Sequence, residues 1–448
     1  MITFAGQSSR DASSPASNTG RLVNLWREPV AAGGRTQHLL RAAMGMELLA
    51  DLDGVFTRAL FAYSNDALIA LVAGGLYKVS GDGVLPIGAV DAGETGQISR
   101  NGKYATVVSG GKYYVWNPDT LALTEPAAGP ITTLGSVDYL AGRTLLGEAG
   151  GFRFCWSDIA DPFTLNGLNF ASAEQRDDDL IRLMVVNGVV MLFGERSTEL
   201  WAPTGQGGSG AFALLGGSVV DRGLRAFNLA CQVEGGVFLV GSDGLAYLVS
   251  GNSWNAVSTP AVNTAIKEGQ AKACLHWSDR GHKFAAITFA DRPAWVYDFT
   301  TAEWWERAEG SNDPWLATAS AQMGADFVVG GDNGSLYRLT NAPQDKGGLL
   351  TRRATSFPVF NGGGWFTIAE VELFLGQGYQ TGDVSIMLEV GRGETFGPVR
   401  HLSLGGPGDF GRRARFMALG RHQMACARLT ITDPVDLPIY SDAQVRLA

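Results

Sequence analysis

Three short motifs hold the residues in this chain that are most able to do chemistry. The first, at residues 205–210, matches the G-x-G-x-x-G pattern of dinucleotide-binding loops. Such a loop binds a dinucleotide only when a strand precedes it and a helix follows it, and no helical pattern follows residue 210. Because the chain contains 60 glycines, a chance match is expected, and the motif predicts an ordinary loop.

The second motif places two histidines beside an aspartate: His276, Asp279 and His282. Imidazole and carboxylate groups bind metal ions, but this spacing fits no standard zinc pattern, so we expect a polar turn between two strands. The chain also lacks a P-loop and a G-x-S-x-G nucleophile motif. We therefore predict no catalytic residue, no cofactor-binding residue, no metal ligand and no enzyme activity.

The third motif is an acidic run, which we pair with a basic cluster near the C-terminus as a candidate contact between subunits. The acidic residues are Glu174, Asp177, Asp178 and Asp179, and the basic residues are Arg412, Arg413, Arg415 and Arg421. Of these, Asp177, Asp178 and Asp179 and Arg412, Arg413 and Arg415 are the possible interface residues, pairing across a head-to-tail contact. The carboxylates could instead bind calcium, although EF-hand spacing is absent. A solvated surface is the alternative for both clusters.

Composition argues against binding nucleic acid through its phosphates. The formal net charge of the 448 residues is −9, whereas proteins that hold DNA in this way are normally basic. A hydrophobic content of 45% is enough for packed cores. Four separate cysteines, at positions 155, 231, 274 and 426, predict reduced, mostly buried thiols. We expect neither a signal peptide nor a membrane-spanning segment.

A recurring hairpin organises the first three quarters of the chain. Each copy consists of a β-rich run, a glycine turn and an aromatic strand. Clear copies lie at residues 68–79, 104–116, 237–247 and 327–339, and weaker ones at 139–156, 183–201 and 284–299. Glycine pairs and Asp-Gly or Asn-Gly steps suit tight hairpin turns. A repeat of about 40–50 residues is typical of β-propeller blades, although a simple stack of hairpins is the alternative.

The pattern changes after a break at residues 341–348. Alternating runs at 369–375 and 384–390 indicate strands with one buried face. We predict an all-β protein: a flexible or partner-docked arm at 1–20, a β-propeller of six or seven blades at 21–345, and a C-terminal β-sandwich at 350–448. One helix is expected at 259–269, where a threonine cap and a proline precede a closing glycine.

Several segments resemble the packaged-DNA stabilisation proteins of short-tailed bacteriophages, which are tail accessory (hub or nozzle) proteins. The likeness spans nearly the whole chain. It rests on residues 21–28 (RLVNLWRE), 154–163 (FCWSDIADPF), 168–174 (LNFASAE), 192–201 (LFGERSTELW), 405–410 (GGPGDF) and 418–421 (ALGR). One departure is the strongly acidic stretch at 175–179.

The resemblance implies a ring of this chain, taken to be six-fold, in the tail of a virion. The ring would lie below the portal and its adaptor, retain the packaged DNA and continue the ejection channel. Expected partners are further copies of the chain, the adaptor, and tail fibre, tailspike or needle proteins. Double-stranded DNA would pass without sequence-specific binding. Assembly would take place in the host cytoplasm.

Two other classes of protein also fit a propeller. A glycan-binding or glycan-cleaving propeller is the main alternative, because paired carboxylates at a propeller mouth can hydrolyse sugars. A general interaction scaffold is the other. Turnover of oligosaccharides would distinguish the first alternative from a virion protein, and ring assembly with an adaptor would distinguish the second.

Overall fold

The computed structural model describes residues 2–4, 20–30, 37–52, 55–393 and 395–447. Contacts divide the chain into two compact units, and neither is continuous in sequence. Unit 1 contains residues 1–47, 279–315 and 339–448, and unit 2 contains residues 48–278 and 316–338. The division falls inside three strands, β5 (Gly45–Asp51), β26 (Ala271–Asp279) and β32 (Ser335–Thr340).

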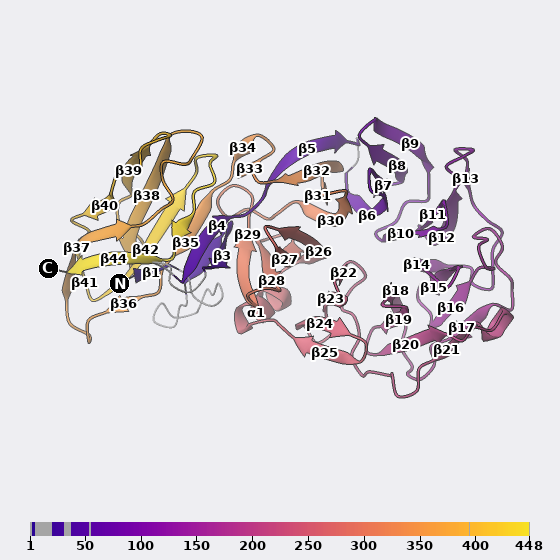
Figure 1. Ribbon diagram of the computed structural model, residues 1–448. Coiled ribbons are helices and arrows are strands. Elements are labelled where there is room, and N and C mark those ends of the chain that lie inside the picture. The colour runs from indigo at the N-terminus through magenta and orange to yellow at the C-terminus, as the bar shows by residue number, and fades with distance from the viewer. Residues whose placement is uncertain (1, 5–19, 31–36, 53–54, 394, 448) are drawn as a thin grey trace. The chain divides into compact units, whose positions relative to one another are not determined.

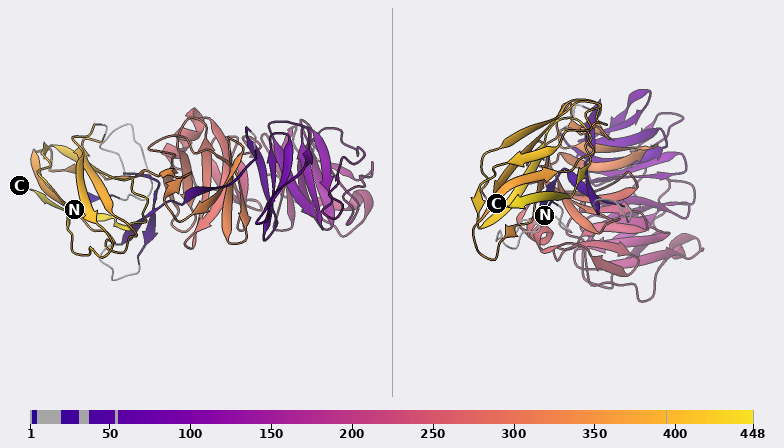
Figure 2. Two further views of the ribbon diagram at one scale, coloured as in Figure 1. Left: turned by 90° about the horizontal axis from the view of Figure 1, so that it is seen from above. Right: turned by 60° about the vertical axis from the view of Figure 1, so that its left-hand side comes forward.

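Unit 2 contains five four-stranded antiparallel sheets, which follow one another around a common centre (Figure 1). Figure 2 (left) shows the same sheets from the side. Their strands are β6 (Thr57–Ser64), β7 (Ala67–Val72), β8 (Gly75–Ser80), β9 (Gly83–Ala89); β10 (Gly96–Asn101), β11 (Tyr104–Ser109), β12 (Lys112–Trp116), β13 (Leu123–Thr124); β14 (Leu134–Leu140), β15 (Arg143–Glu148), β16 (Arg153–Trp156), β17 (Phe170–Ser172); β18 (Leu180–Val186), β19 (Val189–Gly194), β20 (Thr198–Pro203), β21 (Phe212–Leu214); and β22 (Ala230–Val233), β23 (Gly236–Val240), β24 (Ala246–Ser250), β25 (Ser253–Ala256).

The repeated hairpin of the sequence is the middle pair of strands in each sheet. The clear copies become β7–β8, β11–β12, β23–β24 and β31–β32. Gly110 and Gly111, between β11 and β12, have φ values of 59° and 84°, which a glycine adopts without steric cost. Every residue of β7 and β23 is buried, because neighbouring blades cover both faces. The predicted β-propeller is therefore confirmed.

A strand from earlier in the chain completes the last sheet of unit 2. Its other strands in unit 2 are β30 (Ala317–Met323), β31 (Asp326–Gly331) and most of β32 (Ser335–Thr340), and β5 lies beside β32. Ser335 Oγ donates a hydrogen bond to Asp51 Oδ1 at 3.2 Å. Ala50 shares a hydrophobic cluster with Val328 and Leu336. Contacts between segments so distant in sequence close the circle of sheets.

Unit 1 contains the predicted C-terminal β-sandwich, which is also confirmed. One sheet contains β1 (Ile2–Thr3), β44 (Asp442–Leu447), β37 (Phe366–Leu373), β40 (Ala414–Met417) and β41 (Arg421–His422). The other contains β35 (Arg352–Thr355), β36 (Val359–Phe360), β38 (Val384–Gly391), β39 (Arg400–Gly405) and β42 (Met424–Ile431). Strand β1 takes residues 2–3 of the predicted arm into the first sheet, and residues 5–19 lie outside the described residues.

The second sheet of the sandwich continues into strands from the rest of unit 1. Strand β2 (Arg21–Val23) pairs antiparallel with β35 and parallel with β29. The remaining strands are β3 (Leu25–Pro29), β4 (His38–Ala42), β27 (His282–Phe289), β28 (Ala294–Asp298), β29 (Glu303–Arg307), β33 (Gln344–Asp345), β34 (Gly348–Leu349) and β43 (Ile439–Tyr440).

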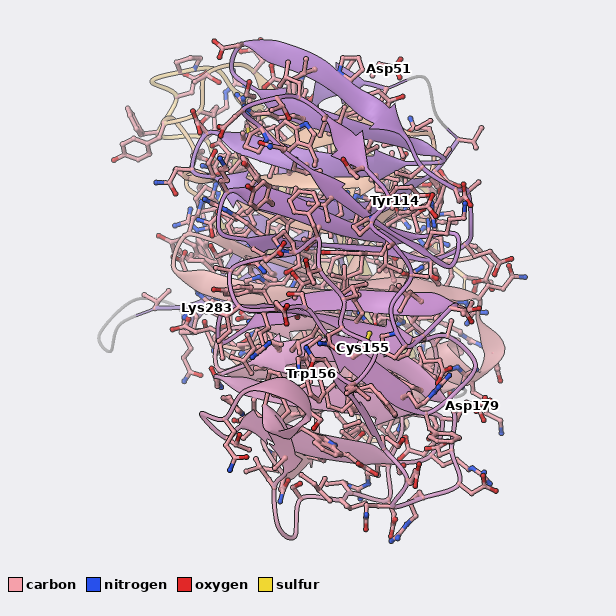
Figure 3. All side chains as sticks on the ribbon, turned by 90° about the vertical axis from the view of Figure 1, so that its right-hand side faces the viewer. Asp51, Tyr114, Cys155, Trp156, Asp179 and Lys283 are labelled. Atoms are coloured by element: carbon pink, nitrogen blue, oxygen red, sulfur yellow. The ribbon has the colours of Figure 1, made fainter. Side chains whose placement is uncertain are left out.

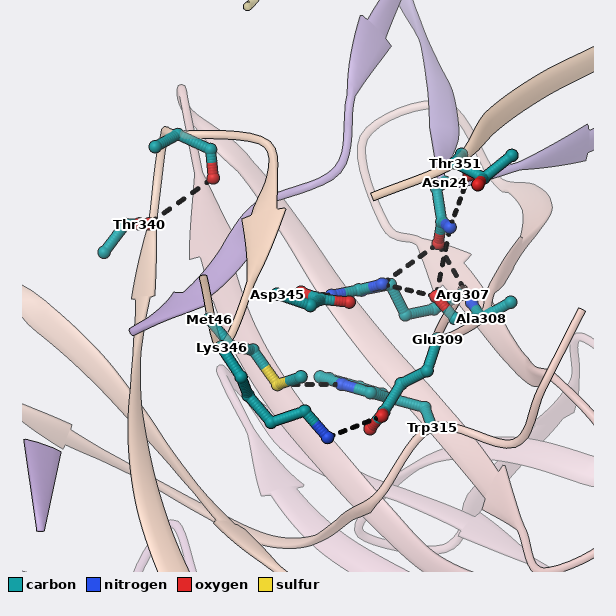
Figure 4. A network of polar contacts seen from close by, with 11 residues as sticks. Asn24, Met46, Arg307, Ala308, Glu309, Trp315, Thr340, Asp345, Lys346 and Thr351 are labelled. Atoms are coloured by element: carbon teal, nitrogen blue, oxygen red, sulfur yellow. Dashed lines mark hydrogen bonds and ion pairs between the residues drawn. The ribbon is translucent and has the colours of Figure 1, made fainter. Parts of the chain in front are cut away.

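A buried polar network joins β2, β29 and β33 within unit 1 (Figure 4). Asn24 adopts φ 56°, a left-handed conformation that asparagine tolerates better than most residues. Arg307 donates to Asn24 Oδ1 at 3.1 Å and, through Nη2, to Asp345 Oδ1 at 2.6 Å. The guanidinium also lies 5.3 Å from the ring centroid of Trp315. This network fixes three segments that are far apart in sequence.

The predicted helix is confirmed as α1 (Pro260–Glu268). The side chain of Thr259 accepts a hydrogen bond from the Val262 amide. Pro260 occupies the first turn, where an amide N–H has no partner within the helix, so the N–H that proline lacks is not needed. Gly269 ends the helix.

Candidate functional site

The innermost strands of the blades surround a cavity of about 360 Å³ in unit 2. Side chains from β6, β10, β14, β18, β22, β26 and β30 line it, and Figure 1 shows several of these strands at the centre of the circle. The polar residues that define its chemistry are Arg58, Gln97, Asp138, Arg182, Cys274 and His276. They come from segments far apart in sequence, and the sequence motifs had indicated only His276.

Arg182 is one of the two cations in the cavity wall, and its guanidinium donates three hydrogen bonds. Its Nε donates to Gln97 Oε1 at 3.3 Å, and its Nη1 donates to the carbonyl oxygens of Phe227 and Ala230 at 3.0 and 2.8 Å. Its guanidinium lies 4.6 Å from the ring centroid of Phe227. Burial lowers the pKa of Arg182 to about 10, although Asp138 opposes this effect. The group therefore remains a cation at neutral pH.

Asp138 is the one carboxylate among the residues that line the cavity. Its Oδ1 accepts from the Tyr139 amide at 2.8 Å and from Ser99 Oγ at 3.2 Å, and its Oδ2 accepts from the Val185 amide at 2.7 Å. Burial raises the pKa of Asp138 to about 6, against the effect of these hydrogen bonds and of Arg182. The hydrogen bonds with Ser99 and Val185 hold β14 beside β10 and β18.

Arg58 and His276 complete the charged and titratable part of the wall. Arg58 donates to the carbonyl oxygens of Ala73 and Thr95 and to Ser109 Oγ, and burial lowers its pKa. Burial also lowers the pKa of His276, so the imidazole is neutral at pH 7. Among the described residues its Nε2 atom is buried without a hydrogen-bond partner.

The four cysteines are free thiols, as predicted. Burial raises the pKa of Cys155 and of Cys231 to about 12 and raises the pKa of Cys274 strongly. Thiols in this state are poor nucleophiles. Figure 3 shows Cys155 and Trp156 within the sheets of unit 2 and Asp179 near an edge.

The acidic run holds a local turn in unit 2. Asp178 Oδ2 accepts from the amides of Arg196 and Ser197 at 2.8 and 2.7 Å, and from Ser197 Oγ at 2.9 Å. Asp177 and Asp179 are exposed. Asp178 is thus engaged within its own blade, a role that the sequence did not indicate.

The basic cluster is likewise paired within its own sheet in unit 1. Arg413 forms two hydrogen bonds of 2.7 Å with Glu372, and Arg415 forms a similar pair with Glu370. Arg412 Nε lies 3.8 Å from Asp409 Oδ2. Arg421 lies over the ring of Trp365, at 5.3 Å from its centroid. The predicted pairing of the two clusters between subunits stays a prediction.

The remaining motifs of the sequence have structural roles. His282 Nδ1 lies 2.7 Å from Asp298 Oδ2, while His276 belongs to the cavity wall. In the described part of the chain, no three His, Cys, Asp or Glu residues are grouped to hold a metal ion. Residues 205–210 form a loop with one 3₁₀ turn (Gly208–Gly210), and the carbonyl of Gly208 accepts from Trp156 Nε1 at 3.1 Å.

The tryptophan–serine–aspartate segment that resembles the phage proteins is a structural element of one blade. Trp156 and Ser157 are fully buried. The Thr144 amide donates to Ser157 Oγ at 3.0 Å, and Arg143 Nη1 donates to the Ser157 carbonyl at 2.7 Å. The Trp156 amide donates to the Asn169 carbonyl at 3.1 Å. The motif therefore positions the long loop that leads to β17.

The circle of four-stranded sheets and the buried motifs define a β-propeller protein of structural type. A family model described as "Bacteriophage P22 Gp10, beta-propeller" matches residues 6–343. The chain belongs to this family, and it is a structural tail protein of a bacteriophage, with a place in the virion. No curated protein sequence matches the chain significantly.

Solved structures show only a distant likeness. The RRP9 WD40 repeats have a TM-score of 0.45 at 10% identity, with 67% of this chain and 99% of that chain covered. The computationally designed Ika8 protein has a TM-score of 0.43 at 15% identity, with 72% and 99% covered. At such TM-scores the likeness carries no argument about this chain. Among the described residues, no helix is long and apolar enough to cross a membrane.

Proposed function

We propose that this chain forms a ring in the tail tube of a short-tailed phage, as a hub or nozzle below the portal and adaptor. The ring retains packaged DNA and provides the channel through which the DNA is ejected. The match of the family model over residues 6–343 carries this proposal. The partners are further copies of the chain, taken as six, the adaptor, and tail fibre, tailspike or needle proteins. Assembly takes place in the host cytoplasm.

The charge of the chain supports a role as a channel wall. DNA is a dense polyanion, and proteins that bind it through phosphates slow its movement. A chain with a net charge of −9 repels DNA at long range and lets it slide. The role requires no catalysis, which agrees with a family of structural proteins.

A glycan-cleaving function finds no support in the cavity. Glycoside hydrolysis normally uses two carboxylates on either side of the scissile bond. The cavity lining contains Asp138 alone, and its oxygens already accept three hydrogen bonds.

A reconstruction of the intact particle tests the proposal. We expect a ring of this chain on the tail axis, in contact with the adaptor, with a continuous channel through it. Copies located away from the axis, or an assembly without a channel, would show that the tail-tube function is wrong.

A further inference from the structure

The axial cavity of unit 2 carries an excess of positive charge. Two of its lining residues, Arg58 and Arg182, are cations, and one, Asp138, is a carboxylate. Both arginines donate only to neutral groups: main-chain carbonyls, a serine hydroxyl and a glutamine amide. Within the described residues, neither forms an ion pair. Arg58 is buried and Arg182 is half-buried, and a cation partly shielded from water without a counter-ion is unfavourable.

Asp138 cannot fully compensate these charges. Its two oxygens are directed by hydrogen bonds to the Tyr139 and Val185 amides and to Ser99. Burial raises its pKa to about 6, so at neutral pH it is mainly ionised and offsets only one of the two positive charges. The positive charge that remains in the cavity wall favours an anion that binds from solution.

The two guanidinium groups border the same short segment of β10. Arg182 Nε contacts the side chain of Gln97. A Cβ atom added at Gly96 would lie 2.4 Å from Leu71 Cδ2 and 3.3 Å from Arg58 Nη2, so Arg58 packs closely against the backbone of this segment. Arg182 Nη2 makes no hydrogen bond within the described residues, whereas its Nε and Nη1 are both used. One donor of a rigid, preoriented fork is therefore left for a ligand.

We propose that this cavity is a binding site for a small oxyanion, the carboxylate or phosphate group of a small solute. Arg182 Nη2 donates to the anion, and Arg58 supplies the second positive charge. A volume of about 360 Å³ lies at the lower end of the range of small-molecule sites, roughly 300–1,000 Å³. The ligand joins the inner strands of several blades and so stabilises the propeller.

Calorimetry and thermal unfolding of the full chain test this site in a buffer free of oxyanions. Inorganic phosphate and citrate are titrated separately, with sodium chloride at matched ionic strength as the control. We expect saturable binding and a rise in the melting temperature of roughly 3 °C at a ligand concentration about 100-fold above Kd. A response to phosphate alone, or to citrate alone, assigns the natural group. An effect no larger than that of chloride overturns the proposal.

Two variants locate the effect. R182Q removes the donor, and R176Q is the matched control, because Arg176 is exposed and pairs with Asp221 at 2.7 Å. We expect R182Q to weaken binding at least about tenfold and R176Q to leave it unchanged. If R182Q does not fold, Q97E serves instead, since it places an isosteric carboxylate beside Arg182 to compete with the ligand. Unchanged affinity in the variant that folds overturns the proposal, as does selenate found only outside the cavity by anomalous diffraction.

Discussion

The two units hold their inward-facing arginines in different ways: Arg307 of unit 1 is buried, and Arg182 of unit 2 is half-buried. In unit 1, Arg307 is 2% exposed, and its Nη2 donates to the Asp345 carboxylate at 2.6 Å. In unit 2, Arg182 donates to carbonyl and amide oxygens only. The first arginine has its counter-ion within the chain, while the second lies in the wall of a cavity with an unused donor. The comparison separates a charge that holds the fold together from one that is available for a ligand.

The structural pair should give the largest effect. Replacing Asp345 by alanine leaves Arg307 buried without a counter-ion, and we expect the free energy of unfolding to fall by about 3–5 kcal/mol. Urea unfolding followed by tryptophan fluorescence measures this, since Trp315 lies against Arg307. D221A, which breaks the exposed Arg176–Asp221 pair, is the control and should lower the free energy of unfolding far less than D345A. Equal losses in the two variants would contradict the structural role.

A half-buried pair in unit 1 should make stability depend on pH. Arg27 Nη1 donates to Glu303 Oε1 at 2.7 Å, yet burial raises the pKa of Glu303 to about 7, with Asp298 adding to the shift and Arg27 opposing it. The folded state thus binds the proton more tightly than the unfolded state. The stabilising contribution is complete below about pH 4.5 and is lost as the pH rises through 7.

The E303Q variant tests this sign. Between pH 4.5 and 8, the wild type should lose about 3 kcal/mol relative to E303Q, because glutamine does not ionise. Urea unfolding of both proteins across this pH range gives the difference directly. A difference that stays constant with pH would show that the pKa of Glu303 is the same in the folded and unfolded states.

The sequence predicts the local elements of this fold well and its long-range closures poorly. The glycine turns and buried strand runs locate the middle hairpins, and Thr259, Pro260 and Gly269 mark the one helix, because these signals act within a few residues. The pairing of Ser335 with Asp51 has no local signal. The sequence also does not predict the buried network of Asn24, Arg307 and Asp345, because only the fold brings these residues together.

The sequence does not predict the cavity either, because its lining residues are brought together only by the fold. Apart from Cys274 and His276, which share β26, its named polar residues lie on different inner strands separated by whole repeats, so no short motif contains them. Arg182 lies in a run of apolar residues, LIRLMVV in β18. A single charge in such a run is the one signal that could have marked it. The acidic and basic clusters, by contrast, are conspicuous in sequence, and the structure pairs Asp178, Arg413 and Arg415 with groups nearby in their own units.

Arg182 itself should cost less to remove than the counter-ion of Arg307. R182M takes away a cation that favours the ionised form of Asp138 and leaves the carbonyls of Phe227 and Ala230 with one donor fewer. The Asp138 carboxylate keeps its three hydrogen bonds. In an oxyanion-free buffer we expect a loss of about 1–2 kcal/mol, clearly smaller than for D345A. A loss as large as that of D345A would show that Arg182 is mainly structural.

The smallest effect should come from the basic cluster of the sandwich. Arg413 is mostly exposed, with 62% of its side chain accessible, although it forms a bidentate pair with Glu372. R413A should therefore reduce the free energy of unfolding only slightly, and less at high salt. The same variant separates this local role from the predicted role between subunits, because a subunit contact would weaken ring assembly while leaving the isolated chain nearly unchanged. Assembly with the adaptor, measured by light scattering at low and high salt, gives the second readout. Normal assembly of R413A together with R412A and R415A would exclude the cluster as a subunit contact and leave only its pairing within the sheet.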